Sequence, residues 1–304
     1  MKIVSLLPSA TEIVFALGLG EQLEGVTYEC DFPDAATTKP VVVGTALSQD
    51  GQLSPREIDD AVRSHMDARQ PIYALNDELI RKIQPDLILA QDLCRVCAVP
   101  SGQVQEALDK LGTDAEVISL DPPDLEGILS GIQRVGRATG TEDRAREVVE
   151  DLRGRIAALK AAAARLPAIR TLALEWSDPP YVGGHWVPEM VQTVGGQNLL
   201  NEPKERSRTV TWREVADAQP EVIVFMPCGF YLEEAEEQAR RLFEVPELGA
   251  TTAVSSDAVF AVDATSYFSR PGPRIVDGMD VLAWAIHPDA YPEPPPGRIS
   301  RVQA

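Results

Sequence analysis

Short runs of apolar, β-prone residues alternate along the chain with segments whose apolar side chains recur at helical spacing. Such a run between turn residues predicts a buried strand, and apolar positions three or four residues apart predict an amphipathic helix. In the first part of the chain we predict strands at 2–7, 41–43, 72–73, 86–90 and 116–120, and helices at 9–17, 54–68, 78–83 and 101–112. This alternation favours a parallel sheet with helices on its faces.

Two of these helices have recognisable starts. Ser9 is the predicted N-cap of the first, with Glu12 three residues later as its capping-box partner. Ser54 and Pro55 open the second.

Residues 124–165 interrupt the alternation with one long stretch that is rich in Ala, Arg, Glu and Leu and contains no proline. Its apolar residues recur at helical spacing, for example at Leu125, Ile128 and Ile132. Gly136 and Gly140 either bend this helix or divide it into two. We predict a rigid spacer helix between two α/β blocks.

After the spacer the alternation resumes, with predicted strands at 170–176, 222–225 and 259–262 and helices at 187–194, 212–218, 232–243 and 273–286. The tail beyond His287 is rich in proline and is expected to be extended and poorly ordered. The predicted division is an N-terminal α/β lobe at 1–122, a spacer helix at 123–166, a C-terminal α/β lobe at 167–287 and a Pro-rich tail at 288–304.

Two segments, one in each block, repeat the same pattern. Residues 78–89 read ELIRKIQPDLIL, and residues 213–224 read REVADAQPEVIV. Each is a short helix, a polar residue, a proline, an acid and an apolar strand. This repeat predicts two similar lobes with parallel sheets that face one another across a ligand cleft.

Charge and hydropathy restrict the partners. The chain has 28 Lys and Arg against 47 Asp and Glu, a formal net charge of −19 at pH 7. We expect no nucleic-acid partner, because nucleic-acid binding needs a cationic surface. No apolar stretch is long enough for membrane insertion. The first residues are too few for a signal-peptide core, so we expect a cytoplasmic protein, or a periplasmic or lipid-anchored one if a leader precedes Met1.

The ends of the α/β region carry distinctive motifs. The chain opens with IVSLLPSATE at 3–12 and ALG at 16–18, and it reads FSRPGPRI at 268–275. Together with the repeated segments and the glycine pairs at 183–184 and 195–196, these motifs resemble the helical-backbone class of substrate-binding proteins. Within that class the likeness, which covers roughly residues 1–287, is greatest to the cobalamin-binding proteins. It implies a two-lobed protein that holds cobalamin or a related corrinoid as its ligand.

The residue types after the predicted strands agree with such a ligand. A corrin is a broad, largely apolar disc with polar amides at its rim, and ligands of open α/β sheets bind beyond the carboxyl ends of strands. Aromatic residues, 6% of the chain, gather in these segments. The candidate ligand-binding residues are Ser9, Ala10, Thr11, Tyr28, Glu29, Thr45, Gln91, Asp92, Trp176, Tyr181, Trp186, Phe230, Tyr267, Phe268 and Arg270.

The resemblance adds roles for a few of these candidates. It places Ser9 and Ala10 against the ligand and Tyr28 over one face of the corrin. It places Phe268 and Arg270 at the rim. The alternative is that the aromatic residues pack within or between the lobes.

All four cysteines follow predicted strands, and His185 lies in a predicted cleft loop. Thiolates and imidazoles suit soft or borderline metals. The candidate ligands of cobalt, or of a separate bound metal ion, are therefore Cys30, Cys94, Cys97, His185 and Cys228. The alternatives are a Cys94–Cys97 disulfide or reactive thiol, and thiols that only shape loops.

Importer-type members of the resembled class usually carry an exposed acid on each lobe that pairs with arginines of an ABC permease. The repeated segment has Glu78 at the first of these positions. The second position is Arg213, with Glu214 beside it. This departure favours a cytoplasmic carrier or sensor over an importer component.

No catalytic set is recognisable in the sequence, since His65, His185 and His287 lie far apart in it and no nucleophile elbow or phosphate loop occurs. We therefore expect a binding protein and not an enzyme. The alternatives are a haem, siderophore or metal binder of the same fold, and a nitrogenase-like enzyme that holds a metal cluster through the cleft cysteines.

Overall fold

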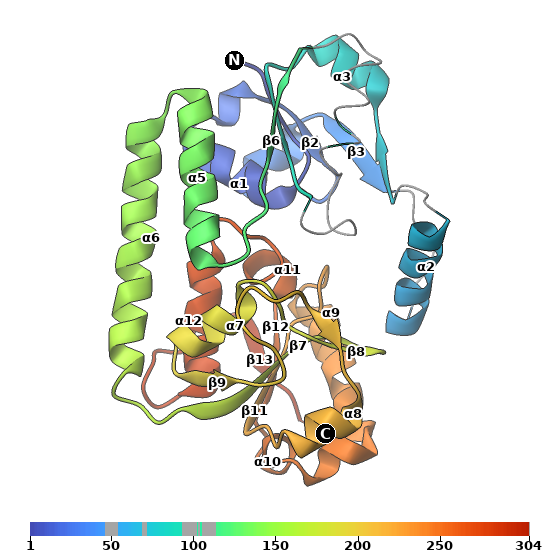
Figure 1. The fold of residues 1–304 in the computed structure, drawn as a ribbon, viewed down its shortest axis with the longest axis vertical. Coiled ribbons are helices and arrows are strands. Elements are labelled where there is room, and N and C mark those ends of the chain that lie inside the picture. The colour runs from blue at the N-terminus through green and yellow to red at the C-terminus, as the bar shows by residue number, and fades with distance from the viewer. Residues whose placement is uncertain (46–53, 69–71, 93–101, 103, 105–113, 304) are drawn as a thin grey trace. The chain divides into compact units, whose positions relative to one another are not determined.

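A computed structural model describes residues 1–45, 54–68, 72–92, 102, 104 and 114–303 (Figure 1). The chain forms two compact units, Met1–Pro122 with Gly127–Glu150 and Pro123–Glu126 with Asp151–Ala304. Each unit contains one sheet and several helices, which confirms the predicted α/β fold class. The predicted helix at 101–112 lies, apart from residues 102 and 104, outside the described residues.

The sheet of the first unit has six strands in the order β4-β3-β2-β1-β5-β6. All neighbours are parallel except β3 and β4, which are antiparallel. Every residue of the central strands β1 and β5 is buried, as expected for parallel strands covered on both faces. The strands are β1 (Ile3–Ser5), β2 (Leu23–Thr27), β3 (Val41–Thr45), β4 (Tyr73–Leu75), β5 (Leu87–Ala90) and β6 (Glu116–Ser119).

The first helix, α1 (Pro8–Ala16), begins one residue earlier than the sequence predicted. Its N-cap is Leu7, which makes no side-chain cap, so the prediction of a Ser9 cap with Glu12 as partner is wrong. Pro8 explains the difference, because its fixed φ and missing N–H suit the first helical turn. Ser9 and Glu12 are instead buried inside the helix.

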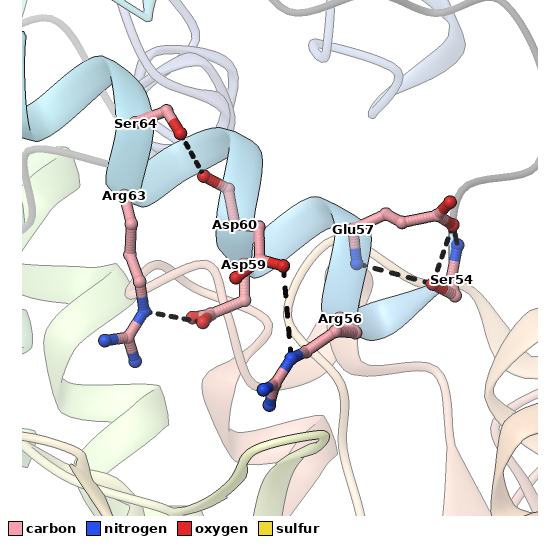
Figure 2. Close-up of polar contacts among 7 residues, drawn as sticks. All are labelled: Ser54, Arg56, Glu57, Asp59, Asp60, Arg63 and Ser64. Atoms are coloured by element: carbon pink, nitrogen blue, oxygen red, sulfur yellow. Dashed lines mark hydrogen bonds and ion pairs between the residues drawn. The ribbon is translucent and has the colours of Figure 1, made fainter.

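Helix α2 (Pro55–Asp67) begins where the sequence predicted (Figure 2). The Ser54 backbone N–H donates to Glu57 Oε2 at 2.8 Å, and Glu57 N–H donates to Ser54 Oγ at 3.3 Å, which completes a capping box. Arg63 Nε lies 2.6 Å from Asp59 Oδ2, and Arg56 Nε lies 3.9 Å from Asp60 Oδ2. Only Pro55 of α2 is fully buried, and Val62 is partly buried against the core of the first unit. Helix α3 (Asp77–Ile83) has Asn76 as its cap.

The predicted spacer is two helices, α5 (Leu125–Thr139) and α6 (Glu142–Ala163). The chain turns at Gly140, whose φ is +67°, so the division that the glycines allowed is the one that occurs. Just before the turn, Gly136 lies against the start of α6. A Cβ added to Gly136 would come within 2.5 Å of the Ala145 Cβ.

The sheet of the second unit has seven strands. Its centre is parallel, with β7 between β11 and the short strand β9, and β11 beside β12. Strands β8, β10 and β13 add antiparallel pairs at the edges, and the sequence predicted none of the three. The strands are β7 (Ile169–Ser177), β8 (Pro180–Val182), β9 (Gly196–Asn198), β10 (Arg208–Thr209), β11 (Val222–Phe225), β12 (Val259–Val262) and β13 (Ile299–Arg301).

Short helices join these strands. Ala235, Leu248 and the β11 residue Ile223 belong to one core of buried side chains. The helices are α7 (Val187–Thr193), α8 (Trp212–Asp217), α9 (Leu232–Arg240), α10 (Thr252–Ser255), α11 (Ala264–Tyr267) and α12 (Ile275–Ile286).

The expectation of an extended, poorly ordered tail is wrong for its last residues. Strand β13 pairs with β12 through Phe260↔Arg301, Ala261↔Ser300 and Val262↔Ile299. Val302 follows it into the core and is 3% exposed. The proline-rich stretch therefore leads to a strand that completes the edge of the sheet.

The repeated sequence pattern corresponds to a repeated turn. Gln84 and Gln219 both have positive φ, 54° and 44°, directly before the proline of each repeat. The acid after the proline then accepts a backbone hydrogen bond at the start of the neighbouring strand. Asp86 accepts from Lys2 N at 2.7 Å, and Glu221 accepts from Arg170 N at 2.9 Å.

Two glycines of α5 provide a test of the close contact at Gly136. We expect Gly136→Ala to lower the free energy of unfolding by about 1 kcal/mol or more, because overpacking against Ala145 outweighs the gain in helix propensity. Gly131→Ala is the matched control. Its Cβ would meet Leu120 at 3.6 Å, an ordinary contact, and it should stabilise by roughly 0.5–1 kcal/mol.

Urea unfolding of the two variants measures both effects. Equal stabilisation by Gly136→Ala and Gly131→Ala would show that the Gly136 contact does not constrain the turn.

Candidate functional site

In the first unit, the predicted ligand-binding residues lie in the segments that follow parallel strands. The carboxyl ends of these strands meet at one edge of the sheet, so the topology brings the segments together. Ser9, Ala10 and Thr11 follow β1, and each is at most 2% exposed. The others are Tyr28 and Glu29 after β2, Thr45 at the end of β3, and Gln91 and Asp92 after β5.

Cys30 joins two of these segments. Its Sγ lies 3.1 Å from Thr11 Oγ1 and 3.3 Å from Thr27 Oγ1, and the residue is 5% exposed. These contacts hold the start of α1 against the turn that carries Tyr28.

Tyr28 is the most exposed aromatic side chain among the candidates, with 40% of its surface accessible. Its hydroxyl donates to Glu29 Oε1 at 3.3 Å. Partial burial of the ring, together with the Glu29 carboxylate, raises the pKa of Tyr28 to about 12. The phenol is therefore neutral at physiological pH and presents an aromatic face with a polar end.

Gln91 and Asp92 link neighbouring strand ends. Gln91 Nε2 donates to Leu120 O at 3.0 Å, and Gln91 is 5% exposed. The Asp92 backbone N–H donates to Asp121 Oδ1 at 2.6 Å, and the Asp92 carboxylate accepts from Ser119 Oγ at 3.0 Å. Gln91 is thus a buried connector, whereas Asp92 is exposed at the sheet edge.

In the second unit, three of the predicted aromatic residues come together. The rings of Trp176 and Phe230 lie 5.4 Å apart between centroids and are tilted by 37°. Trp176 lies near the carboxyl end of β7, where it pairs in register with Tyr181 of β8. All three side chains are half-buried. They form an aromatic cluster at the carboxyl ends of β7 and β11.

Hydrogen bonds join the segment after β12 to Trp186 and to the aromatic cluster. Trp186 Nε1 donates to the Phe268 carbonyl at 3.0 Å, and the two residues are 8% and 3% exposed. The Thr265 backbone N–H donates to the Phe230 carbonyl at 3.1 Å. The buried Trp186 and Phe268 side chains therefore hold this segment in place. Arg270, two residues after Phe268, is also buried and is 5% exposed.

Tyr267 lies under two cations. The guanidinium carbon of Arg298 is 4.8 Å from the ring centroid, and that of Arg274 is 5.5 Å away. Burial raises the pKa of the Tyr267 hydroxyl despite these neighbours.

Glu175 lies next to the aromatic cluster in sequence, and it was not among the predicted site residues. It precedes Trp176 in β7, and its Oε1 accepts from Gly184 N at 3.3 Å. Burial raises its pKa to about 7, although hydrogen bonds from Ser207 and Gly184 act in the opposite direction. An acid within the apolar run LALEW was the available signal.

The turn that contacts Glu175 is tightly packed. A Cβ on Gly184 would come within 2.1 Å of Ser207 N, so only glycine fits there. The next residue, His185, has a φ of 54°, and its pKa is lowered by burial and by the charge of Arg206. Among the described residues, His185 Nε2 has no hydrogen-bond partner.

Comparison with known proteins identifies the family. Residues 3–265 match the periplasmic binding protein family. The chain belongs to this family. Its members are substrate-binding proteins, which confirms the prediction of a binding protein rather than an enzyme.

Two relatives and one structure indicate the range of the family. The chain is 26% identical over 283 residues to the vitamin B12-binding protein of Vibrio cholerae, covering 92% of this chain and 86% of the relative. It is 24% identical over 301 residues to YvrC of Bacillus subtilis, an uncharacterized ABC transporter substrate-binding lipoprotein, covering 96% and 82%. The structure of a periplasmic haem-binding protein from Pseudomonas aeruginosa matches with a TM-score of 0.73 and 23% identity, covering 100% and 99%.

These matches bear on the expected location. One relative is named as a lipoprotein, and the similar solved structure is named as a periplasmic protein, so these names give no support to the expectation of a cytoplasmic protein. Within the described part of the chain, no helix combines the length and apolar character needed to span a membrane.

The predicted metal ligands do not assemble within the part of the chain that the structure covers. Among those residues, no group of three or more His, Cys, Asp and Glu side chains is placed to hold a metal ion. Cys30 forms hydrogen bonds with threonine hydroxyls in the first unit. His185 and the exposed Cys228 belong to the second unit. Cys94 and Cys97 lie outside the described residues.

The two positions at which the sequence analysis looked for a docking acid differ in the structure as they do in sequence. Glu78 is exposed on α3. Arg213 is exposed on α8 and pairs with Asp217 at 3.0 Å. Glu214 is engaged in a capping box with Thr211, so it is held at the helix start.

The raised pKa of Glu175 predicts a pH dependence of stability. Because the folded-state pKa of about 7 lies above the unfolded value of 4.5, the carboxyl group favours the folded state at low pH. That contribution falls as the pH rises from about 4.5 to about 7. We expect Glu175→Gln to gain stability relative to the unsubstituted protein over this interval, by up to about 3 kcal/mol.

Urea unfolding at pH 5 and pH 8 tests this expectation. Glu233→Gln, at an exposed position of α9, is the control and should show the same difference from the unsubstituted protein at both pH values. A Glu175→Gln effect that does not change with pH would contradict the role assigned to the carboxyl group.

Proposed function

We propose that this protein binds cobalamin or a related corrinoid and delivers it to an ABC permease. The observation that carries the proposal is the similarity to a vitamin B12-binding protein along 92% of the chain. The aromatic side chains at the strand ends agree with it, because a corrin requires apolar walls with a few polar groups.

The exposure of the candidate residues separates two roles within the proposed site. We infer that the accessible residues contact the ligand, namely Tyr28, Glu29, Thr45, Asp92, Trp176, Tyr181 and Phe230. We infer that the buried candidates hold the contacting side chains in place without touching the ligand. They are Ser9, Ala10, Thr11, Gln91, Trp186, Phe268 and Arg270.

Tyr28 suits either of the two candidate ligands. Haem iron needs an axial protein ligand, and tyrosine serves as one. A corrinoid can be held by aromatic contact and hydrogen bonds to its amides, for which a neutral phenol is suited.

Delivery to a permease accords with the ABC transporter relative. We propose that Glu78 on α3 contributes the docking acid of the first unit, since its carboxylate is exposed on a helix. The second unit presents the Arg213–Asp217 pair at the equivalent place, and there the permease surface must differ from one that receives an acid.

Titration with three ligands tests the proposed substrate. We expect cyanocobalamin to bind with micromolar or tighter affinity, measured by calorimetry or by the change in its absorption spectrum. Haem and a ferric siderophore are the competing ligands and should bind more weakly. Failure to bind any cobalamin at micromolar concentration would overturn the proposal, and tight haem binding would replace it with the haem alternative.

Two substitutions of Tyr28 separate ring contact from iron ligation. Tyr28→Ala should weaken cyanocobalamin binding about tenfold, because it removes an aromatic contact. Tyr28→Phe should change the affinity by no more than about twofold, since the ring remains. Met66→Ala, at an exposed apolar position on α2, is the control. Equal losses for Tyr28→Phe and Tyr28→Ala would assign the contact to the hydroxyl group instead.

A further inference from the structure

The segment after β12, residues 263–270, contains three of the predicted ligand-binding residues. It begins at Asp263, whose carboxylate accepts from Ser266 N at 2.9 Å and thereby starts α11. The Thr265 backbone N–H donates to Phe230 O in the aromatic cluster, and the Phe268 carbonyl accepts from Trp186 Nε1. A shift of this segment would therefore displace Phe230 and Trp186.

The C-terminal strand holds the other side of the same segment. Its pairing with β12 continues beyond the strand end, because Asp263 N donates to Arg298 O at 3.0 Å. The same residue places its guanidinium 4.8 Å from the Tyr267 centroid and 3.7 Å from Asp277 Oδ1 on α12. Arg298 therefore contacts Asp263, the Tyr267 ring and Asp277 of α12.

We propose that Arg298 is a positioning residue for the segment 263–270, which supports the ligand-contacting residue Phe230. The proposal rests on the proposed function, because it assigns the residue a role in ligand affinity. Arg298 acts through Tyr267 and Asp263 rather than by touching the ligand. A cation over an aromatic ring is stabilising, and here it fixes the ring that ends α11.

The same strand provides a matched control. Arg301 also lies over an aromatic ring, with its guanidinium carbon 5.1 Å from the Phe260 centroid. Phe260 is a core residue of β12 that precedes the segment 263–270, and it is 1% exposed. Arg298→Gln and Arg301→Gln therefore each remove one cation–ring contact from β13 or its flank, and both leave the backbone pairing intact. Arg155 remains within 2.8 Å of Asp277 in the Arg298 variant, so that carboxylate keeps a cation.

Two measurements on the full chain decide the proposal. In hydrogen–deuterium exchange of the ligand-free protein, the amides of residues 263–268 should exchange several-fold faster in Arg298→Gln than in Arg301→Gln. The affinity for cyanocobalamin should fall about threefold to tenfold in Arg298→Gln and by less than about twofold in Arg301→Gln.

The outcomes separate this inference from the proposed function. Unchanged exchange at 263–268 in Arg298→Gln overturns the positioning role whatever the ligand. Faster exchange with unchanged affinity shows that the segment is held by Arg298 but does not govern binding, which also overturns the proposal. If the unsubstituted protein binds no cyanocobalamin, the proposed ligand fails. Equal loss of affinity in the two variants would assign the effect to general destabilisation and contradict a specific role for Arg298.

Discussion

Parallel pairing between buried strands is the constraint on which both units depend. In each unit the first strand pairs with a strand that follows a helix–proline turn, β1 with β5 and β7 with β11. Parallel strands require crossover connections, so the segments that follow the parallel strands of a sheet emerge at the same edge. Residues such as Tyr28 and Asp92 in one unit, or Trp176 and Phe230 in the other, therefore gather without being close in sequence.

The same Gln–Pro–acid turn precedes the paired strand in both units. In both, a glutamine in the left-handed region reverses the chain, a proline follows, and an acid receives the backbone N–H of the neighbouring strand. The carboxylate satisfies a donor at the strand start that would otherwise lack a partner. A turn built from local geometry thus fixes the register of a long-range pair, which explains why its sequence pattern recurs.

Much of the architecture was predictable because the signals were local. Apolar runs such as Leu87–Ala90 and Val222–Phe225 became buried strands, and the capping box at Ser54 formed as expected. The Ser9 cap failed because Pro8 supplied an equally local and stronger start. Strand β13 was missed because its three residues become a strand only by pairing with distant β12.

The site was predictable only as a set of segments. Position after a predicted strand identified Trp176 and Phe230, but burial of Ser9 and Gln91 depends on how the turns fold over the sheet edge. The role of Glu175 could not be predicted, because a single acid in an apolar run does not show whether backbone N–H groups will donate hydrogen bonds to its carboxyl group. Gly184 provides that donor, and its own environment is set by residues 205–207 from a separate loop.

The late position of β13 has a consequence for synthesis on the ribosome. Strand β12 is complete well before residues 299–301 are added, and until then one side of it presents unpaired backbone groups in the nascent chain. An apolar strand with an open edge is a template for wrong pairing. The proline-rich stretch delays the covering strand while resisting strand formation itself. The second unit therefore completes this side of its sheet only after residues 299–301 have been added, and slow emergence of the preceding stretch would lengthen the time in which the β12 edge stays unpaired.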